Sequence, residues 1–306
     1  MSIKPSASIM ERRNASTVNI DRLTTQDMLA IINKEDKQTA DAITSCLPDI
    51  ARLVDNAAAT LSRGGRIVMI GAGASGRAAV QTACEYAPDG KHPLLGLIAG
   101  GPQAMSKELD AASADYDRGV ADLEAIEFND SDMLIGLTVS GKTPWVWGAM
   151  RHAWSLGAQV AAITQNPASE AAQLASIVLA PDTGPEVVAG FGNPKAHLAQ
   201  KQILNMLTTG LAVRSGRVYS NLRVDLQAND ARWTERQIAI VMAAAECSRA
   251  EAKAALESCH HHCRTAILMV LTGLDAWRAR DLLAENHDHL RLALQDAKRV
   301  AATPLS

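Results

Sequence analysis

The chain has 306 residues, of which 47% are hydrophobic and 21% charged, and its formal net charge is −3. This composition is typical of a globular protein with a sizeable core, and the charge provides no basic field for nucleic acid or an anionic membrane. The longest apolar runs are far shorter than the ~20 residues of a membrane span, and the N-terminus lacks the apolar core of a secretion signal. The five cysteines lack the spacing of a disulfide framework, so we expect reduced thiols in the cytoplasm.

Two helices are predicted before a set of buried strands. Thr25 can cap the first helix, and the second covers residues 41–62 and ends at Gly64-Gly65. Five short runs that follow are apolar almost throughout, as in strands that are covered on both faces. They are residues 66–70, 94–98, 133–138, 159–164 and 176–180, and they alternate with predicted helices over residues 75–85, 103–126, 144–156 and 168–174. This alternation predicts an α/β fold with a doubly wound, five-stranded parallel sheet.

The last third of the chain is predicted to be helical. A long helix over residues 195–214 is stopped by Gly216, and residues 215–229 form a polar connection. The remaining residues have the apolar spacing of a small bundle of three or four helices. We therefore predict a boundary near residue 228, with an α/β domain over residues 1–228, N-terminal helices included, and a helical domain over residues 229–306.

The stretch GAGASG, residues 71–76, follows a predicted strand and opens a helix, whose free N–H groups attract anions. It fits the G-x-G-x-x-G pattern of dinucleotide-binding proteins. That function also requires an acidic residue at the end of the next strand, to hold a ribose. The next strand, in LLGLIAGG, ends without one. We therefore favour a different phosphate ligand, held by Ser75 and Gly76.

A second loop has the same position after another strand. It contains Thr138, Ser140, Gly141 and Thr143, and Pro144 suits the first turn of the helix that follows. Hydroxyl and backbone N–H groups can satisfy phosphate oxygens with little cationic charge. A helix cap explains one hydroxyl, but three hydroxyls within six residues favour phosphate binding.

The two units, GAGASGR and LTVSGKTP, resemble the sugar isomerase (SIS) domain, which binds phosphosugars. The whole chain is similar to the N-acetylmuramic acid 6-phosphate etherase family: ERRNASTVNIDRLTTQDMLAIINKEDK, GPEVV, AQKQILNMLTTG and GRVYSNLRVD follow in the family order. The tail resembles the family's ubiquitin-associated-like helical end. The resemblance implies that D-lactate is eliminated from carbon 3 of a ring-opened sugar, and that hydration then gives N-acetylglucosamine 6-phosphate. It also implies a phosphorylated amino sugar as partner, no cofactor, and a homodimer with the site at the subunit interface.

The resemblance implies two acid/base carboxylates, of which one is replaced. Glu85, in TACEYAP, matches the acidic residue of the family's A-S-E-C-P-P and is the expected proton donor to lactate. The family's second glutamate ends the pattern A-V-E-G-A-E, and this chain has Ser113 there, in ELDAASAD. Serine is not a general base unaided near neutral pH. Asp110, on the same face of the predicted helix, is our candidate for the base, with Asp117 as a weaker one.

A second group of departures lies in GPEVVAGFGNPKAHLAQK. Glu186 and Lys195 match the family and are expected to bind substrate, whereas the family's Ser-Thr-Arg is Phe191-Gly192-Asn193 here and its Gly-Thr is His197-Leu198. Two other functions therefore stay open. One is a phosphosugar-binding regulator without turnover, as in the glucokinase regulatory protein. The other is an aldose–ketose isomerase that uses His197 and Glu186.

The stretch Cys259-His-His-His-Cys263 could offer up to three metal ligands on one face of a helix. No second pair of Cys or His residues lies at the spacing of a zinc site. We therefore expect no metal.

Overall fold

The computed structural model describes residues 12–86, 93–227 and 230–302. The chain falls into two compact units, Met1–Thr209 and Gly210–Ser306, and the division lies within the long helix α8 (Pro194–Arg214). The predicted boundary near residue 228 lies outside the described residues. No helix in the described ranges is long and apolar enough to cross a membrane.

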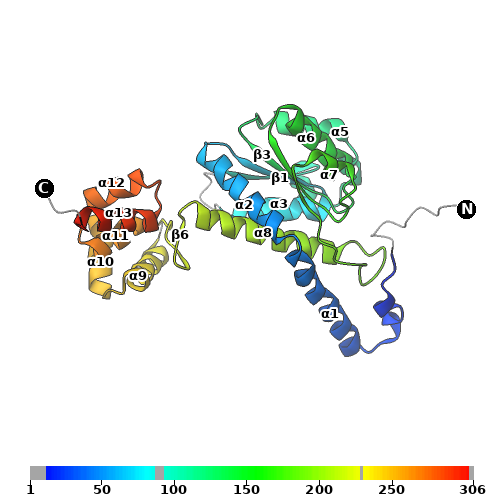
Figure 1. Cartoon of the computed structure of the whole chain (residues 1–306). Coiled ribbons are helices and arrows are strands. Elements are labelled where there is room, and N and C mark those ends of the chain that lie inside the picture. Colours follow the sequence, from blue (N-terminus) through cyan, green and yellow to red (C-terminus); the bar gives the residue numbers. More distant parts are fainter. Residues whose placement is uncertain (1–11, 87–92, 228–229, 303–306) are drawn as a thin grey trace, which may run out of the picture. The chain divides into compact units, whose positions relative to one another are not determined.

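The first unit contains a five-stranded parallel sheet with the strand order β2-β1-β3-β4-β5 (Figure 1). The central strands β1 and β3 pair in register, with Ile67 opposite Met133. The strands are β1 (Ile67–Gly71), β2 (Leu94–Ile98), β3 (Met133–Leu137), β4 (Gln159–Ile163) and β5 (Ile177–Leu179). The predicted α/β fold with a doubly wound parallel sheet is confirmed.

Helices cover both faces of this sheet (Figure 1). Val68 and Leu134 belong to a buried cluster that also contains Leu123 of α5 and Trp145 of α6. Helices α2 and α3 lie on the opposite face. Since side chains alternate between the two faces and both faces are covered, the strands are apolar at nearly every position. The helices are α2 (Leu47–Ser62), α3 (Gly73–Tyr86), α5 (Tyr116–Glu124), α6 (Pro144–Ser155) and α7 (Glu170–Leu174).

The first long helix differs in its bounds from the prediction. Helix α2 begins at Leu47 and not at residue 41, because helix α1 covers Thr25–Thr44. The N-cap of α1 is Thr24, not Thr25, because the Thr24 Oγ1 accepts a hydrogen bond from the backbone N–H of Asp27 at 3.2 Å. Two short 3-10 helices precede it, η2 (Ala15–Thr17) and η3 (Ile20–Arg22).

The single helix predicted over residues 103–126 is wrong. The segment consists of a 3-10 helix η4 (Gly101–Met105), a short helix α4 (Asp110–Ser113) and α5. Asp115 causes one of the breaks, because its backbone is extended and its side chain accepts a hydrogen bond from the N–H of Arg118 at 2.9 Å, which starts a new helix. Residues 106–109 are not helical, and this places Glu108 in a connection between two short elements.

The second unit contains a short antiparallel hairpin and a group of helices with one shared core. The two strands of the hairpin are β6 (Val218–Tyr219) and β7 (Leu222–Arg223). After the hairpin the described residues form five helices, where three or four were predicted: α9 (Ala231–Ala245), α10 (Arg249–Ser258), α11 (Cys263–Thr272), α12 (Ala276–Glu285) and α13 (Leu290–Ala302).

The stretch from Cys259 to Cys263 is a turn, not part of a helix as the prediction assumed. Cys259 caps the end of α10, His260 and His261 have positive φ angles, and Cys263 begins α11. The two cysteines therefore do not share a helix face. Among the described residues, no group of three or more His, Cys, Asp or Glu side chains could hold a metal ion.

Candidate functional site

The two loops predicted to bind phosphate meet at one edge of the sheet. Because β1 and β3 are neighbouring parallel strands, both loops leave from the same carboxyl-terminal edge. The chain continues from β1 to β2 on one side and from β3 to β4 on the other. This is the topological switch point of the sheet, where open α/β folds bind ligands.

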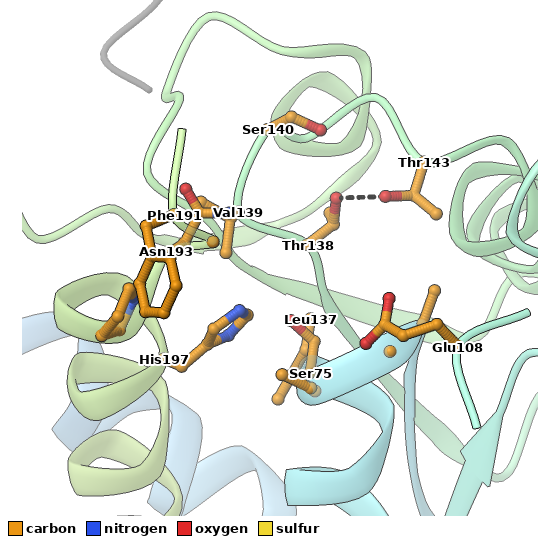
Figure 2. A pocket seen from close by; sticks show the side chains of 15 residues that line it. Ser75, Glu108, Leu137, Thr138, Val139, Ser140, Thr143, Phe191, Asn193 and His197 are labelled. Atoms are coloured by element: carbon orange, nitrogen blue, oxygen red, sulfur yellow. Dashed lines mark hydrogen bonds between the residues drawn. The ribbon is translucent and has the colours of Figure 1, made fainter. Parts of the chain in front are cut away.

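A pocket of about 390 Å³ lies at this switch point (Figure 2). Its walls come from four parts of the chain: residues 72–75 of the first loop, residues 137–140 with Thr143 of the second, residues 191–194 with His197, and Glu108. The volume is within the range of small-molecule sites. The described lining residues include no lysine or arginine. Binding of an anion here therefore relies on hydroxyl groups, backbone N–H groups and helix N-termini.

The second loop is held in a fixed shape by its own hydroxyl groups. The Oγ1 atoms of Thr138 and Thr143 lie 2.9 Å apart, and the Thr138 Oγ1 accepts from the N–H of Gly141 at 3.2 Å (Figure 2). The Ser140 Oγ accepts from the N–H of Lys142 at 3.2 Å. Gly141 has a φ of 71°, and a Cβ there would lie 2.0 Å from the Ser169 Oγ. Only glycine fits this position, so the shape of the loop depends on Gly141.

The first loop is packed against the strand that precedes it. A Cβ at Gly76 would lie 2.5 Å from the carbonyl oxygen of Gly71, so glycine lets α3 begin directly beside β1. Ser75 lines the pocket, and its Oγ donates to the Gln200 Oε1 on α8 at 2.9 Å. The His197 Nδ1 lies 3.2 Å from the same oxygen. Gln200 of α8 thus contacts both a serine and a histidine that line the pocket.

Glu186 does not line the pocket, although the sequence predicts it as a substrate-binding residue. Its carboxylate accepts from the N–H of Lys195 at 3.0 Å and from the N–H of Ala196 at 3.1 Å. A carboxylate at this place satisfies free N–H groups and complements the helix dipole at the start of α8. Glu186 therefore stabilises the start of α8, which follows the lining residues 191–193.

Lys195, in the first turn of α8, is buried. Its side chain is 1% exposed, and its Nζ donates to the Glu35 Oε2 of α1 at 2.8 Å and to the Pro185 carbonyl at 3.1 Å. Burial acts to raise the pKa of Glu35, but hydrogen bonds from Lys195, Ser16 and Asn14 outweigh it and hold this pKa below its ordinary value. The buried pair ties α1 to the pocket-forming segment.

Glu85 lies at the far end of α3 from the pocket. It follows Ser75 by ten residues, which is ~15 Å along a helix axis. Its carboxylate accepts from the Lys201 Nζ at 2.9 Å and from the Gln81 Nε2 at 2.7 Å. These two hydrogen bonds lower the pKa of Glu85 against the smaller effect of burial. Glu85 does not line the pocket of its own chain.

Asp110 is exposed at the start of α4, and neither it nor Ser113 lines the pocket. The Ser113 Oγ donates to the Asp110 carbonyl at 2.8 Å. The carboxylate among the described lining residues is Glu108, whose Oε1 accepts from the Arg77 Nη2 at 2.8 Å. Sequence reasoning missed Glu108, because on one long predicted helix nothing distinguishes it from its acidic neighbours.

Comparison with known proteins decides the family. An N-acetylmuramic acid 6-phosphate etherase from Klebsiella aerogenes is 48% identical over 299 residues, which cover 97% of this chain and 100% of that protein. One from Photorhabdus laumondii is 47% identical over 294 residues, which cover 95% and 98%. The chain belongs to the N-acetylmuramic acid 6-phosphate etherase family. The predicted resemblance is thereby confirmed.

Within this etherase-family chain, residues 49–154 match the family model of the glucokinase regulatory protein N-terminal SIS domain. That segment contains both loops of the pocket. Among solved structures, a phosphoheptose isomerase from Neisseria gonorrhoeae is 17% identical with a TM-score of 0.49, covering 61% of this chain and 98% of that one.

Proposed function

We propose that this protein is an N-acetylmuramic acid 6-phosphate etherase, a lyase that releases D-lactate and leaves N-acetylglucosamine 6-phosphate. Membership of the etherase family over nearly the full chain is the observation that carries this proposal. The pocket at the switch point supports it, because its hydroxyl groups and helix N-termini suit the phosphate of an amino sugar.

The 6-phosphate would be held by the hydroxyl groups of Ser75, Thr138, Ser140 and Thr143. All four residues line the pocket, and Thr143 is the N-cap of α6. The positive ends of the two helix dipoles supply the charge complement in place of basic side chains. The glycines at positions 76 and 141 shape the loops, while Glu186 and Lys195 support the wall opposite.

The reaction requires two proton-transfer groups. A base removes the hydrogen at carbon 2 of the open-chain aldehyde, which that aldehyde makes acidic, and an acid protonates the lactyl oxygen as it leaves carbon 3. Water then adds to the double bond between carbons 2 and 3. Glu85 is the proposed acid. Asp110 is the base expected from the sequence, although it does not line the pocket.

We further propose a homodimer in which Glu85 of the partner subunit completes the pocket. Within its own chain Glu85 lies about three helical turns from Ser75, which is too far to serve the same sugar. A carboxylate with a lowered pKa is a poor proton donor. The acid role therefore requires that this pKa rises in the substrate-bound site.

The cytoplasm is the proposed compartment. All five cysteines are free thiols in the structure, which fits a reducing environment.

A phosphosugar-binding regulator without turnover is the second candidate. Two observations favour it: Ser113 replaces the expected glutamate, and the SIS segment matches the glucokinase regulatory protein model. The isomerase alternative has less support. It requires both His197 and Glu186 at the substrate, but Glu186 caps α8 and, of these two residues, His197 alone lines the pocket.

A coupled assay for lactate release from N-acetylmuramic acid 6-phosphate tests the proposal, run on the wild type and on Glu85→Ala and Asp110→Ala variants. We expect lactate from the wild type and a loss of about 100-fold or more in Glu85→Ala. No lactate, with a melting temperature that the sugar phosphate still raises, would favour the regulator.

A further inference from the structure

Glu108 has the position of a catalytic group that the sequence did not single out. Among the described residues that line the pocket, it is the one with a carboxylate. Its side chain is 72% exposed, and Figure 2 shows the carboxylate directed into the pocket, opposite Phe191 and Asn193. A Cβ placed on Gly73 would lie 3.9 Å from the Glu108 Oε1. Glu108 therefore reaches the start of α3, beside the loop that carries Ser75.

The ion pair with Arg77 orients this carboxylate. The Arg77 Nη2 donates to the Glu108 Oε1 at 2.8 Å, while its Nη1 donates to the Ala104 carbonyl at 2.9 Å. Arg77 belongs to α3, and Ala104 belongs to η4. The guanidinium therefore links the segment that contains Glu108 to the helix that begins at the pocket. An exposed ion pair of this kind contributes little to stability. Its main effect here is on the position of the carboxylate.

Asp110 and His197 are the competing bases, and the structure separates them from Glu108. Asp110 is exposed on α4 and does not line the pocket. His197 lines the pocket, and its Nδ1 lies 3.2 Å from the Gln200 Oε1, which leaves its Nε2 as a competing base that the variants below test. Glu108 alone of the three combines a carboxylate with a place in the pocket wall.

We infer that Glu108 is the general base of the etherase reaction, an inference that rests on the proposed function. In the open-chain substrate the C2–H bond breaks, the proton passes to Glu108, and the electron pair forms the enolate of the aldehyde. The enolate then expels the lactyl oxygen from carbon 3, which takes a proton from the acid. Water adds its oxygen to carbon 3 and returns a proton to the acid, and Glu108 returns its proton to carbon 2. The sum is substrate plus water giving sugar phosphate plus lactate.

Glu108→Gln is the principal test, because the amide keeps the shape and an acceptor for Arg77 but cannot take a proton. We expect kcat for lactate release to fall about 100-fold or more. The melting temperature stays within ~3 °C of wild type, since the lost ion pair is exposed. N-acetylglucosamine 6-phosphate still raises that temperature. Glu124→Gln, which alters an exposed glutamate on α5, is the matched control and keeps wild-type kcat.

A partial reaction distinguishes a base from a merely structural residue. In deuterium oxide the wild type exchanges the carbon 2 hydrogen of N-acetylglucosamine 6-phosphate, and Glu108→Gln does not. Formate restores part of the lactate release to Glu108→Ala, because a small carboxylate can enter the vacated space. If Glu108→Gln still exchanges the carbon 2 hydrogen, the inference is overturned. It is also overturned if Glu108→Gln stays active while Asp110→Asn or His197→Gln loses all activity. A wild type that releases no lactate overturns both this inference and the proposed function.

Complementation tests how Glu108 is combined with Glu85 of the partner subunit. In a mixed dimer of Glu85→Gln and Glu108→Gln chains, one site has both native carboxylates if they come from different chains. Random mixing of the two inactive variants then restores about one quarter of wild-type activity. If Glu108 and Glu85 act within one chain, or if Glu108 has no catalytic part, the mixture gains no activity over its separate components.

Discussion

Lys195→Met removes one partner of a buried ion pair and should strongly destabilise the first unit. Lys195 is 1% exposed and the Glu35 side chain is 6% exposed, with 2.8 Å between Nζ and Oε2. Removing one member of such a pair typically costs about 3–5 kcal/mol, because the other charge stays buried. The Glu35 carboxylate keeps hydrogen bonds from Asn14 at 2.8 Å and Ser16 at 3.0 Å, so we expect about 3 kcal/mol. That is a large part of the 5–15 kcal/mol that stabilises a typical domain.

The pH dependence gives this prediction a sign. The pKa of Glu35 lies below its ordinary value of 4.5 in the folded protein, so its pairing stabilises the fold above that pH and is lost as pH falls through the folded pKa. In Lys195→Met the effect of burial is opposed by fewer hydrogen bonds, so the pKa of Glu35 rises. Protonation then relieves the buried charge, and the difference in unfolding free energy from wild type shrinks toward low pH.

Urea unfolding followed by circular dichroism measures this difference at about pH 7.5 and about pH 4.5. Lys253→Met is the control, since Lys253 is 62% exposed and lies 3.7 Å from Glu257, a pair worth at most about 0.5 kcal/mol. A loss below about 1 kcal/mol for Lys195→Met at neutral pH would refute the reasoning. So would a loss that grows as the pH falls.

Two further substitutions and one labelling experiment test separate parts of the structure. Gly141→Ala places a Cβ within 2.0 Å of a serine oxygen at a φ of 71°. It should therefore weaken the binding of N-acetylglucosamine 6-phosphate, measured by calorimetry, at least about 10-fold. Gly157→Ala, whose Cβ would have open space around it, should not weaken this binding. The Asp132 side chain is 2% exposed, and burial raises its pKa, but hydrogen bonds from Arg66 outweigh burial and hold the pKa below its ordinary value. Asp132→Asn should therefore lower the unfolding free energy by about 3 kcal/mol above pH ~4 and by less below that pH. Burial raises the pKa of Cys263 to about 12, so a thiol reagent at neutral pH should modify the exposed Cys84 and leave Cys263 until urea unfolds the chain; equal rates would contradict the described burial.

The sheet could be predicted because its physics is local. Strands that are covered on both faces have to be apolar throughout, and glycine, serine and threonine after β1 and β3 mark the two loops. The helix predicted over residues 103–126 failed for a reason that periodicity does not detect. The backbone of Asp115 is extended, and its side chain accepts a hydrogen bond that starts a new helix.

The sequence predicted only part of the pocket lining. The hydroxyl groups of Ser75, Thr138 and Thr143 follow strands directly, so local sequence places them at the pocket. Lys195 and Glu35 are 160 residues apart, and only the folded chain shows that this lysine is buried in an ion pair. The position of Glu108 likewise depends on the break in the predicted helix.

The isotope distribution of the products tests the central claim most directly. The protein is incubated with N-acetylmuramic acid 6-phosphate in water enriched in the heavy oxygen isotope, and both products are analysed by mass spectrometry. Elimination and hydration put the heavy oxygen on carbon 3 of N-acetylglucosamine 6-phosphate and leave the lactate unlabelled. Labelled lactate with an unlabelled sugar, or no lactate at all, would contradict the etherase mechanism.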